Sequence, residues 1–185
     1  TQYVLDVSRE DVRDLIWAQL DAILSVNKID YVKWDFNRYI TDADSARLPA
    51  DQKKEFFHRF ILGTYDLMNR LTTKYPDILL ESCSGGGGRF DPAMLYYSPQ
   101  IWTSDNTDAI DRLSIQFGTS LCYPASSMGA HVSDYPRAFY GTKADVALWG
   151  SFGYELDIRK LTDEQKAEFK GHIAQYHKYY DLIHF

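Results

Sequence analysis

Apolar residues recur at helical spacing in two parts of the chain, with a short, mostly apolar run between them. The first set lies within residues 8–26, where Ser8 is the expected N-cap. The second set ends near Lys74, and Pro76 closes that helix. The run Ile29–Trp34 between them is typical of a buried strand. A strand between two helices predicts an α/β chain.

The alternation of strands and helices continues along the sequence. Further strands are predicted at residues 78–82, 100–103, 120–123 and 152–156. Helices are predicted to start at Asp91-Pro92, Thr107, Ala144 and the capping box Thr162–Gln165. The stretch 124–136 is expected to be a loop over a binding face. Repeated strand and helix units favour a parallel sheet with right-handed crossovers, either in a barrel or in an open sheet.

Length, charge and cysteine content argue against several classes of protein. The chain of 185 residues can bury a core as one domain, but a complete eight-stranded α/β barrel needs roughly 250 residues. Its net charge of −6, with scattered lysines and arginines, argues against nucleic-acid binding. Neither a signal peptide nor a membrane-spanning run is expected in the sequence, which begins at Thr1. Two reduced cysteines, Cys83 and Cys122, fit a cytoplasmic location.

Acidic residues follow two of the predicted strands. Asp35 comes directly after Lys33-Trp34, and Lys33 would favour its ionised form from the same face of the strand. Asp105 follows the strand that begins at Gln100 and is expected to face the mouth of the sheet. Glycosidic cleavage requires such a pair of carboxyl groups, one as nucleophile and one as general acid. The alternative for Asp35 is a structural pair with Lys33 at the sheet end.

Asp108 competes with Asp105 for the role of general acid. It follows Thr107 and would lie in the first turn of a helix, where a carboxylate interacts favourably with the helix dipole. We therefore assign the acid/base role to Asp105 and a helix-starting role to Asp108. Asn37, two residues past Asp35, is a candidate donor to a sugar hydroxyl.

The segment Glu81–Asp91 contains the glycine run Gly85–Gly88. It lacks both the ending of a phosphate-binding loop and the glycine spacing of a dinucleotide fold. Glycines here would let main-chain amides approach a neutral sugar, with Cys83 beside them, although a flexible turn is the alternative. The 5 histidines have no metal-ligand spacing, so no metal is expected, and His131 is expected to brace the long loop or to touch substrate.

These motifs together resemble glycoside hydrolase family 36, the α-galactosidase group with a (β/α)₈ catalytic barrel. The resemblance runs through the segments Val4–Ser8, Lys33–Arg38, Glu81–Asp91, Pro99–Asp108, Ile115–Ser120 and Phe152–Asp157. It implies that Asp35 is the nucleophile and Asp105 the acid/base. It also implies that the galactose subsite is lined by Lys33, Trp34, Asn37, Cys83, Gly85 and Gly86.

The resemblance further implies a retaining double displacement on α-1,6-galactosides such as melibiose, raffinose and stachyose, without a cofactor. The two carboxyl groups are then expected to lie about 5–7 Å apart across one mouth. A relative that transfers galactose, a relative that accepts N-acetylgalactosamine, and a non-catalytic fragment are the alternatives.

The early barrel strands and the flanking β-domains of the family have no counterpart in this sequence. Residues 1–185 are therefore interpreted as a fragment of one catalytic barrel domain, a partial TIM barrel. The fragment would hold about five parallel βα units that correspond to barrel strands four to eight. The full-length parent is expected to be a homo-oligomer.

Overall fold

The computed structural model describes residues 3–41 and 43–184, and it divides into two compact units. The first unit holds the chain up to Glu81 together with Asp91–Pro99, and the second holds Ser82–Phe90 and the chain from Gln100 onward. The division runs through β2 (Leu79–Cys83), which begins in one unit and ends in the other. Each unit has a buried apolar cluster of its own.

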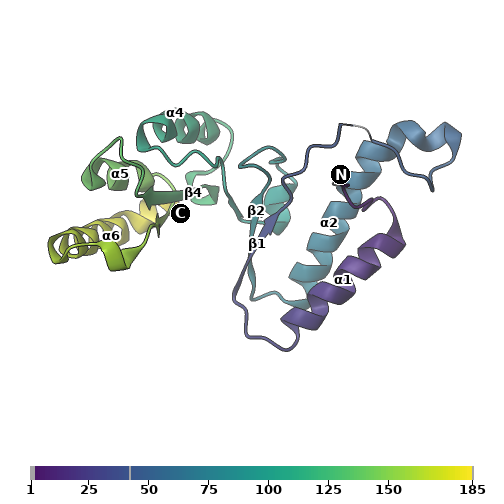
Figure 1. Cartoon of the computed structure of the whole chain (residues 1–185), viewed down its shortest axis with the longest axis horizontal. Helices are drawn as coiled ribbons and strands as arrows, with labels where there is room; N and C mark the ends of the chain where they lie inside the picture. Colours follow the sequence, from purple (N-terminus) through teal and green to yellow (C-terminus); the bar gives the residue numbers. More distant parts are fainter. Residues whose placement is uncertain (1–2, 42, 185) are drawn as a thin grey trace. The chain divides into compact units, whose positions relative to one another are not determined.

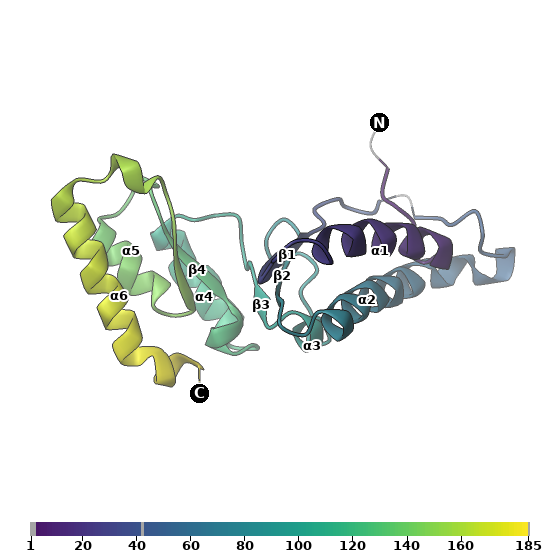
Figure 2. The same ribbon diagram turned by 90° about the horizontal axis from the view of Figure 1, so that it is seen from below.

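Two helices of the first unit, α1 (Glu10–Leu24) and α2 (Phe56–Lys74), lie side by side (Figure 1, Figure 2). The 3₁₀ turn η1 (Ala50–Glu55) leads into α2, and the short helix α3 (Met94–Tyr97) belongs to the same unit. Strand β1 (Tyr31–Asp35) lies next to β2. The amide of Leu79 donates to the carbonyl oxygen of Asp30 at 3.0 Å where the two strands begin.

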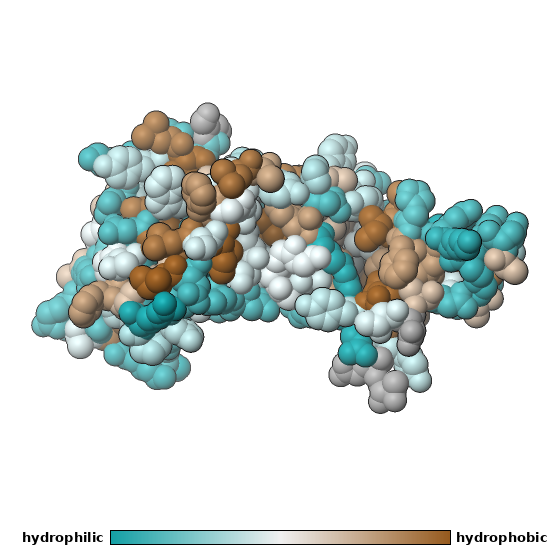
Figure 3. Space-filling model, turned by 90° about the horizontal axis from the view of Figure 1, so that it is seen from above, coloured by the Kyte–Doolittle hydropathy of each residue, from teal (hydrophilic) through white to brown (hydrophobic). Residues whose placement is uncertain are grey.

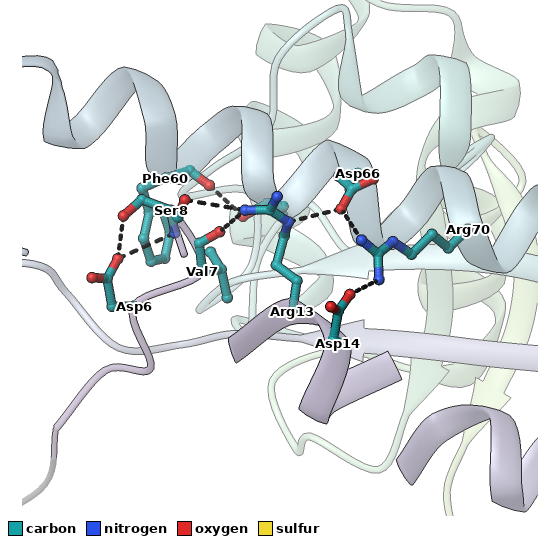
Figure 4. A network of polar contacts seen from close by, with 9 residues as sticks. Asp6, Val7, Ser8, Arg13, Asp14, Phe60, Asp66 and Arg70 are labelled. Carbon is teal, nitrogen blue, oxygen red and sulfur yellow. Dashed lines mark hydrogen bonds and ion pairs between the residues drawn. The ribbon is translucent and has the colours of Figure 1, made fainter. Parts of the chain in front are cut away.

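Charged side chains join α1 to α2. The Nε of Arg13 donates to Asp66 at 2.7 Å, and Arg70 pairs with Asp14 at 2.7 Å and with Asp66 at 2.9 Å (Figure 4). The apolar cluster of this unit consists of Val7, Phe56, Phe60 and Leu67. Trp34 of β1 packs against that cluster, so the core fixes the strand that ends in Asp35.

Helix α1 begins later than the sequence predicts. Arg9 occupies the N-cap position without a side-chain cap, whereas Ser8 was expected there. The hydroxyl and the amide of Ser8 both donate to the carboxylate of Asp6 (Figure 4), so the serine stabilises a turn before the helix. The predicted apolar face is partly open, because Leu15 and Ile23 are 59% and 54% exposed. The predicted strands at 29–34 and 78–82 are present with small shifts at their ends, but β1 alternates between exposed and half-buried residues, so it is not the buried strand that was predicted.

In the second unit, β4 (Gly129–Ser133) and β5 (Ser151–Glu155) pair in parallel. Ala130 and Val132 of β4 form the buried cluster of this unit with Ala144 and Ala147. The two strands are accompanied by three helices and two 3₁₀ turns, namely α4 (Ala109–Ser120), α5 (Tyr140–Ala147), α6 (Asp163–His184), η2 (Ala125–Ser127) and η3 (Ile158–Lys160). Strand β3 (Gln100–Ile101) lies next to the end of β2.

The predicted strand at 120–123 is wrong. Helix α4 continues to Ser120 and a turn follows, in which Leu121 is 70% exposed. The strand of this region is β4, inside the stretch 124–136 that the sequence predicts as a loop. Ala130 and Val132 are fully buried, so small side chains rather than a bulky apolar run define this strand.

Several helix starts also differ from the prediction. Helix α4 is capped by Asp108 rather than Thr107, and α5 begins at Tyr140 rather than Ala144, so that the buried Lys143 lies inside the helix. The capping box that opens α6 is confirmed, because Thr162 and Gln165 exchange hydrogen bonds of 2.9 and 3.2 Å. The described residues contain strands β1 to β5, and the α/β class with parallel pairing agrees with the prediction.

The surface carries apolar side chains, brown in Figure 3, among polar ones. In the second unit, Leu113, Phe117 and Trp149 are 53%, 67% and 68% exposed, and they line a cavity of about 320 Å³ with Met128 and Val146. Helix α4 and the turn that follows α5 therefore present apolar side chains at the surface. No helix in the described part of the chain has the length and apolarity needed to cross a membrane.

Candidate active site

Asp35 is the last residue of β1, and its side chain is exposed. The side-chain amide of Asn37 donates to Oδ2 of Asp35 at 2.9 Å. Because side chains alternate along a strand, Lys33 shares the face of Asp35 while Trp34 lies on the opposite face, toward the core. The strand thus presents a carboxylate with an amide donor at its C-terminal end.

Glu81 of β2 holds Lys33 in place. Its side chain is 4% exposed, and its carboxylate lies 3.5 Å from Nζ of Lys33. The hydroxyl of Tyr31 donates to the other carboxylate oxygen of Glu81. Neither Tyr31 nor Glu81 was expected from the sequence to support the site. An acidic residue inside an otherwise apolar strand was the available signal, since a buried carboxylate needs a partner.

The glycine turn after β2 is closely packed within the second unit. Gly85 and Gly86 adopt φ values of 56° and 78°, which favour glycine. The amide of Gly87 donates to the carbonyl oxygen of Thr103 at 3.0 Å, and a Cβ on Gly86 would lie 2.6 Å from Cα of Ser104. The turn therefore contacts the main chain directly before Asp105. Cys83, at the end of β2, is 2% exposed.

Asp105 is exposed in the loop between β3 and α4. Asp108, three residues later, is buried and caps α4, because its Oδ1 accepts from the amides of Ile110 and Asp111 at 2.8 and 3.2 Å. Asp108 therefore has the structural role at the helix start that the sequence predicts, as the N-cap rather than in the first turn. The carboxylate available to a ligand in this loop is that of Asp105.

Arg112 of α4 is buried and donates to four acceptors around the Asp105 loop. Its Nε donates to the carbonyl oxygen of Asn106 at 2.7 Å, and its Nη2 donates to the carbonyl oxygen of Ser104. Its Nη1 donates to Oγ1 of Thr103 at 2.9 Å and to the carbonyl oxygen of Gly129 at 3.2 Å. Burial lowers the pKa of Arg112, while the charges of Glu155 and Asp105 act in the opposite direction. Sequence reasoning missed this residue.

His131 lies in β4 rather than in a loop, which corrects its predicted setting. Its ring packs against Trp102 at a tilt of 37° with centroids 4.7 Å apart, and its Nδ1 lies 3.7 Å from Oε2 of Glu155. The guanidinium carbon of Arg112 lies 4.4 Å from the centre of the Trp102 ring. His131 thus packs against Trp102, the residue that follows β3.

Asp35 belongs to the first unit and Asp105 to the second, so their predicted separation stays a prediction. Among residues 3–41 and 43–184, no group of three or more histidine, cysteine and acidic side chains is placed to hold a metal ion.

A family model and several known proteins match this chain. The family model described as Melibiase matches residues 1–185. The alpha-galactosidase Mel36A of Lactobacillus acidophilus is 52% identical over 190 residues, which cover 100% of this chain and 26% of that protein. The chain therefore spans about a quarter of the length of such relatives.

Two crystal structures of variants of the family 36 alpha-galactosidase AgaA from Geobacillus stearothermophilus are also similar. One variant carries an Asp-to-Asn substitution and is in complex with raffinose. Its structure matches with a TM-score of 0.95 and 52% identity, and the match covers 98% of this chain and 26% of the AgaA chain. The other carries an Asp-to-Ala substitution and is in complex with stachyose. Its structure matches with a TM-score of 0.91 and 53% identity, and the match covers 95% of this chain and 25% of the AgaA chain.

Proposed function

This chain belongs to the melibiase family, and we propose on that basis that it carries both catalytic aspartates of a retaining α-galactosidase. The substrates would be oligosaccharides with a terminal α-1,6-linked galactose, such as melibiose and raffinose. Asp35 is proposed as the nucleophile and Asp105 as the acid/base. The reaction needs no cofactor, because protonation and a carboxylate nucleophile supply both halves of the chemistry.

In the first step, a carboxylate oxygen of Asp35 bonds to the anomeric carbon while the bond from that carbon to the leaving oxygen breaks. Asp105 gives its proton to the leaving oxygen, so the sugar remains as an ester on Asp35. In the second step, Asp105 takes a proton from water, whose oxygen attacks the anomeric carbon and breaks the ester. Two inversions at one carbon retain its configuration.

One observation carries this proposal. The aspartates substituted in the raffinose and stachyose complexes of the Geobacillus enzyme are the same number of positions apart as Asp35 and Asp105. Replacement of a carboxylate by an amide or a methyl group is the change that would leave an oligosaccharide intact in a glycosidase. At about half identity, equal spacing supports the assignment of the same two residues here.

The local geometry supports the remaining roles. The Asn37 amide orients the carboxylate of Asp35, and Glu81 holds Lys33 on the face of the strand that carries Asp35. Main-chain amides of the turn at Gly85 and Gly86 would approach sugar hydroxyls, with Cys83 beside them. Trp34 packs against the core, so its proposed part in the subsite would use an edge of the ring.

We further propose that the chain is part of one (β/α)₈ catalytic domain and supplies about five of its strands, in the positions of strands four to eight. The rest of the galactose pocket would come from the other barrel strands of the protein. Assembly of full-length copies into a homo-oligomer and a cytoplasmic location also belong to this proposal.

The test is made in the full-length protein that contains this chain. We expect hydrolysis of melibiose and raffinose with α-galactose as the first product seen by NMR, and nearly complete loss of turnover in Asp35→Asn. Asp30→Asn is the matched control, because Asp30 is an exposed aspartate just before the same strand. Absence of hydrolysis would favour a non-catalytic role, and galactosyl transfer at high acceptor concentration would favour a transferase. Near-normal activity of Asp35→Asn would overturn the nucleophile assignment.

A further inference from the structure

One guanidinium group holds the main chain on both sides of Asp105. The carbonyl oxygens of Ser104 and Asn106 immediately flank this aspartate, and both accept hydrogen bonds from Arg112. The side chain of Thr103 accepts a further bond at 2.9 Å. Arg112 therefore donates hydrogen bonds to three of the four residues 103–106, namely Thr103, Ser104 and Asn106.

The same guanidinium is itself fixed in place. Arg112 is 3% exposed, and its guanidinium carbon lies over the Trp102 ring, 4.4 Å from the ring centre. Its Nη1 also reaches the carbonyl oxygen of Gly129 in β4 at 3.2 Å. A donor that is held by a helix, a tryptophan ring and a neighbouring strand cannot follow a moving loop, so the loop is held to it.

We propose that Arg112 is a positioning residue that holds Asp105 where it can protonate the leaving oxygen. This inference rests on the proposed function, since it gives Asp105 the role of general acid. Lysine cannot replace arginine here, because a single ammonium nitrogen cannot span acceptors that the planar fork reaches with three nitrogens. A displacement of about 1 Å is enough to cost on the order of 100-fold in rate.

The expected signature is a dependence on the leaving group. An activated phenol departs with little protonation, whereas the sugar leaving group of melibiose needs the acid. In the full-length protein, Arg112→Lys is expected to lower kcat/KM for melibiose by about 100-fold but the first step on a dinitrophenyl galactoside by less than about 3-fold. Arg137→Lys is the matched control, because Arg137 is an exposed arginine that pairs with Asp111 at 3.0 Å.

Two further variants separate positioning from folding. Thr103→Val removes one acceptor of Arg112 and should give a smaller loss with the same leaving-group dependence, even if Arg112→Lys fails to fold. Adding Arg112→Lys or Thr103→Val to Asp105→Ala should cause no further loss on melibiose, because the positioned group is already absent. Equal losses on both substrates, or additive losses in the double variants, would overturn the proposal.

The variant Asp105→Ala distinguishes a failure of the proposed function from a failure of the inference about Arg112. If this variant shows no leaving-group dependence, Asp105 is not the general acid and the proposed function is wrong at that residue. If Asp105→Ala shows the dependence but Thr103→Val and Arg112→Lys do not, the inference about Arg112 alone is wrong.

Discussion

Gly86 lies against the main chain of Ser104, so closely that an added Cβ would come within 2.6 Å of the Cα atom of Ser104. The φ of Gly86 is also 78°, a value that side chains disfavour. These two constraints act on the same residue. They make the glycine turn a packing surface for the loop that carries Asp105, in addition to its proposed part in the sugar subsite.

Gly86→Ala is therefore expected to lower the free energy of unfolding by about 1–3 kcal/mol and to reduce turnover of melibiose. The reduction follows because the methyl group displaces the main chain before Asp105. Gly118→Ala is the control, since Gly118 is an exposed glycine within α4 and has open space around its Cβ position. That variant should gain up to about 1 kcal/mol. Equal urea midpoints for the two variants would contradict this account of the turn.

Asp105 and Asp108 lie in one loop but should respond differently to replacement by alanine. Asp108→Ala removes the cap of α4 and should cost about 1 kcal/mol of stability, with similar kinetic effects on all substrates. Asp105→Ala should leave the melting temperature nearly unchanged and slow melibiose more than activated aryl galactosides. Kinetics on both substrates and thermal unfolding of both variants measure this difference. Leaving-group dependence in Asp108→Ala instead would exchange the two roles.

Tyr65 of α2 should make the stability of the first unit depend on alkaline pH. Its hydroxyl donates to both oxygens of Asp91 at 2.9 and 2.8 Å, and burial followed by this carboxylate raises its pKa from 10.0 to about 12. A raised pKa favours the neutral phenol in the folded state. Its contribution is thus fully present below pH 10 and is lost as pH rises from 10 toward 12.

Tyr65→Phe should cost about 1 kcal/mol at pH 7 and show a shallower loss of stability between pH 10 and 12. Urea unfolding across this pH range measures both effects. Tyr96→Phe is the control, because Tyr96 is 81% exposed and the change should have little effect at any pH. Parallel pH profiles of Tyr65→Phe and the unsubstituted protein would show that the phenol of Tyr65 is not the titrating group.

The positions of two acidic residues at element ends could be predicted because they depend on local patterns. Asp35 ends strand β1 and Asp108 caps a helix, and each position follows from neighbouring residues alone. Strand β4 could not be recognised in this way, because its buried residues Ala130 and Val132 are small and alternate with His131. The bulkier run at 120–123 met the apolar criterion better but lies in a helix end and a turn.

The partners in contacts that join distant segments could not be identified from the residue types, even where a buried acidic residue such as Glu81 indicated that a partner was needed. Arg112 acts on main-chain carbonyl oxygens, which every residue possesses, so neither Ser104 nor Asn106 indicates the contact. Tyr31 and Glu81 come together only because β1 lies next to β2. Such contacts depend on the tertiary fold, whereas the periodicity of apolar residues predicts only the individual helices and strands.

The covalent intermediate gives the most direct test of the central claim that Asp35 is the nucleophile of a retaining α-galactosidase. A fluorinated galactosyl fluoride should react with the full-length protein, because the ring fluorine slows release of the ester more than its formation. Peptide mass spectrometry is expected to find one fluorogalactosyl group on Asp35 and none in Asp35→Asn. A label on Asp105 or another residue, or turnover of the reagent to the β-anomer without any label, would contradict the account.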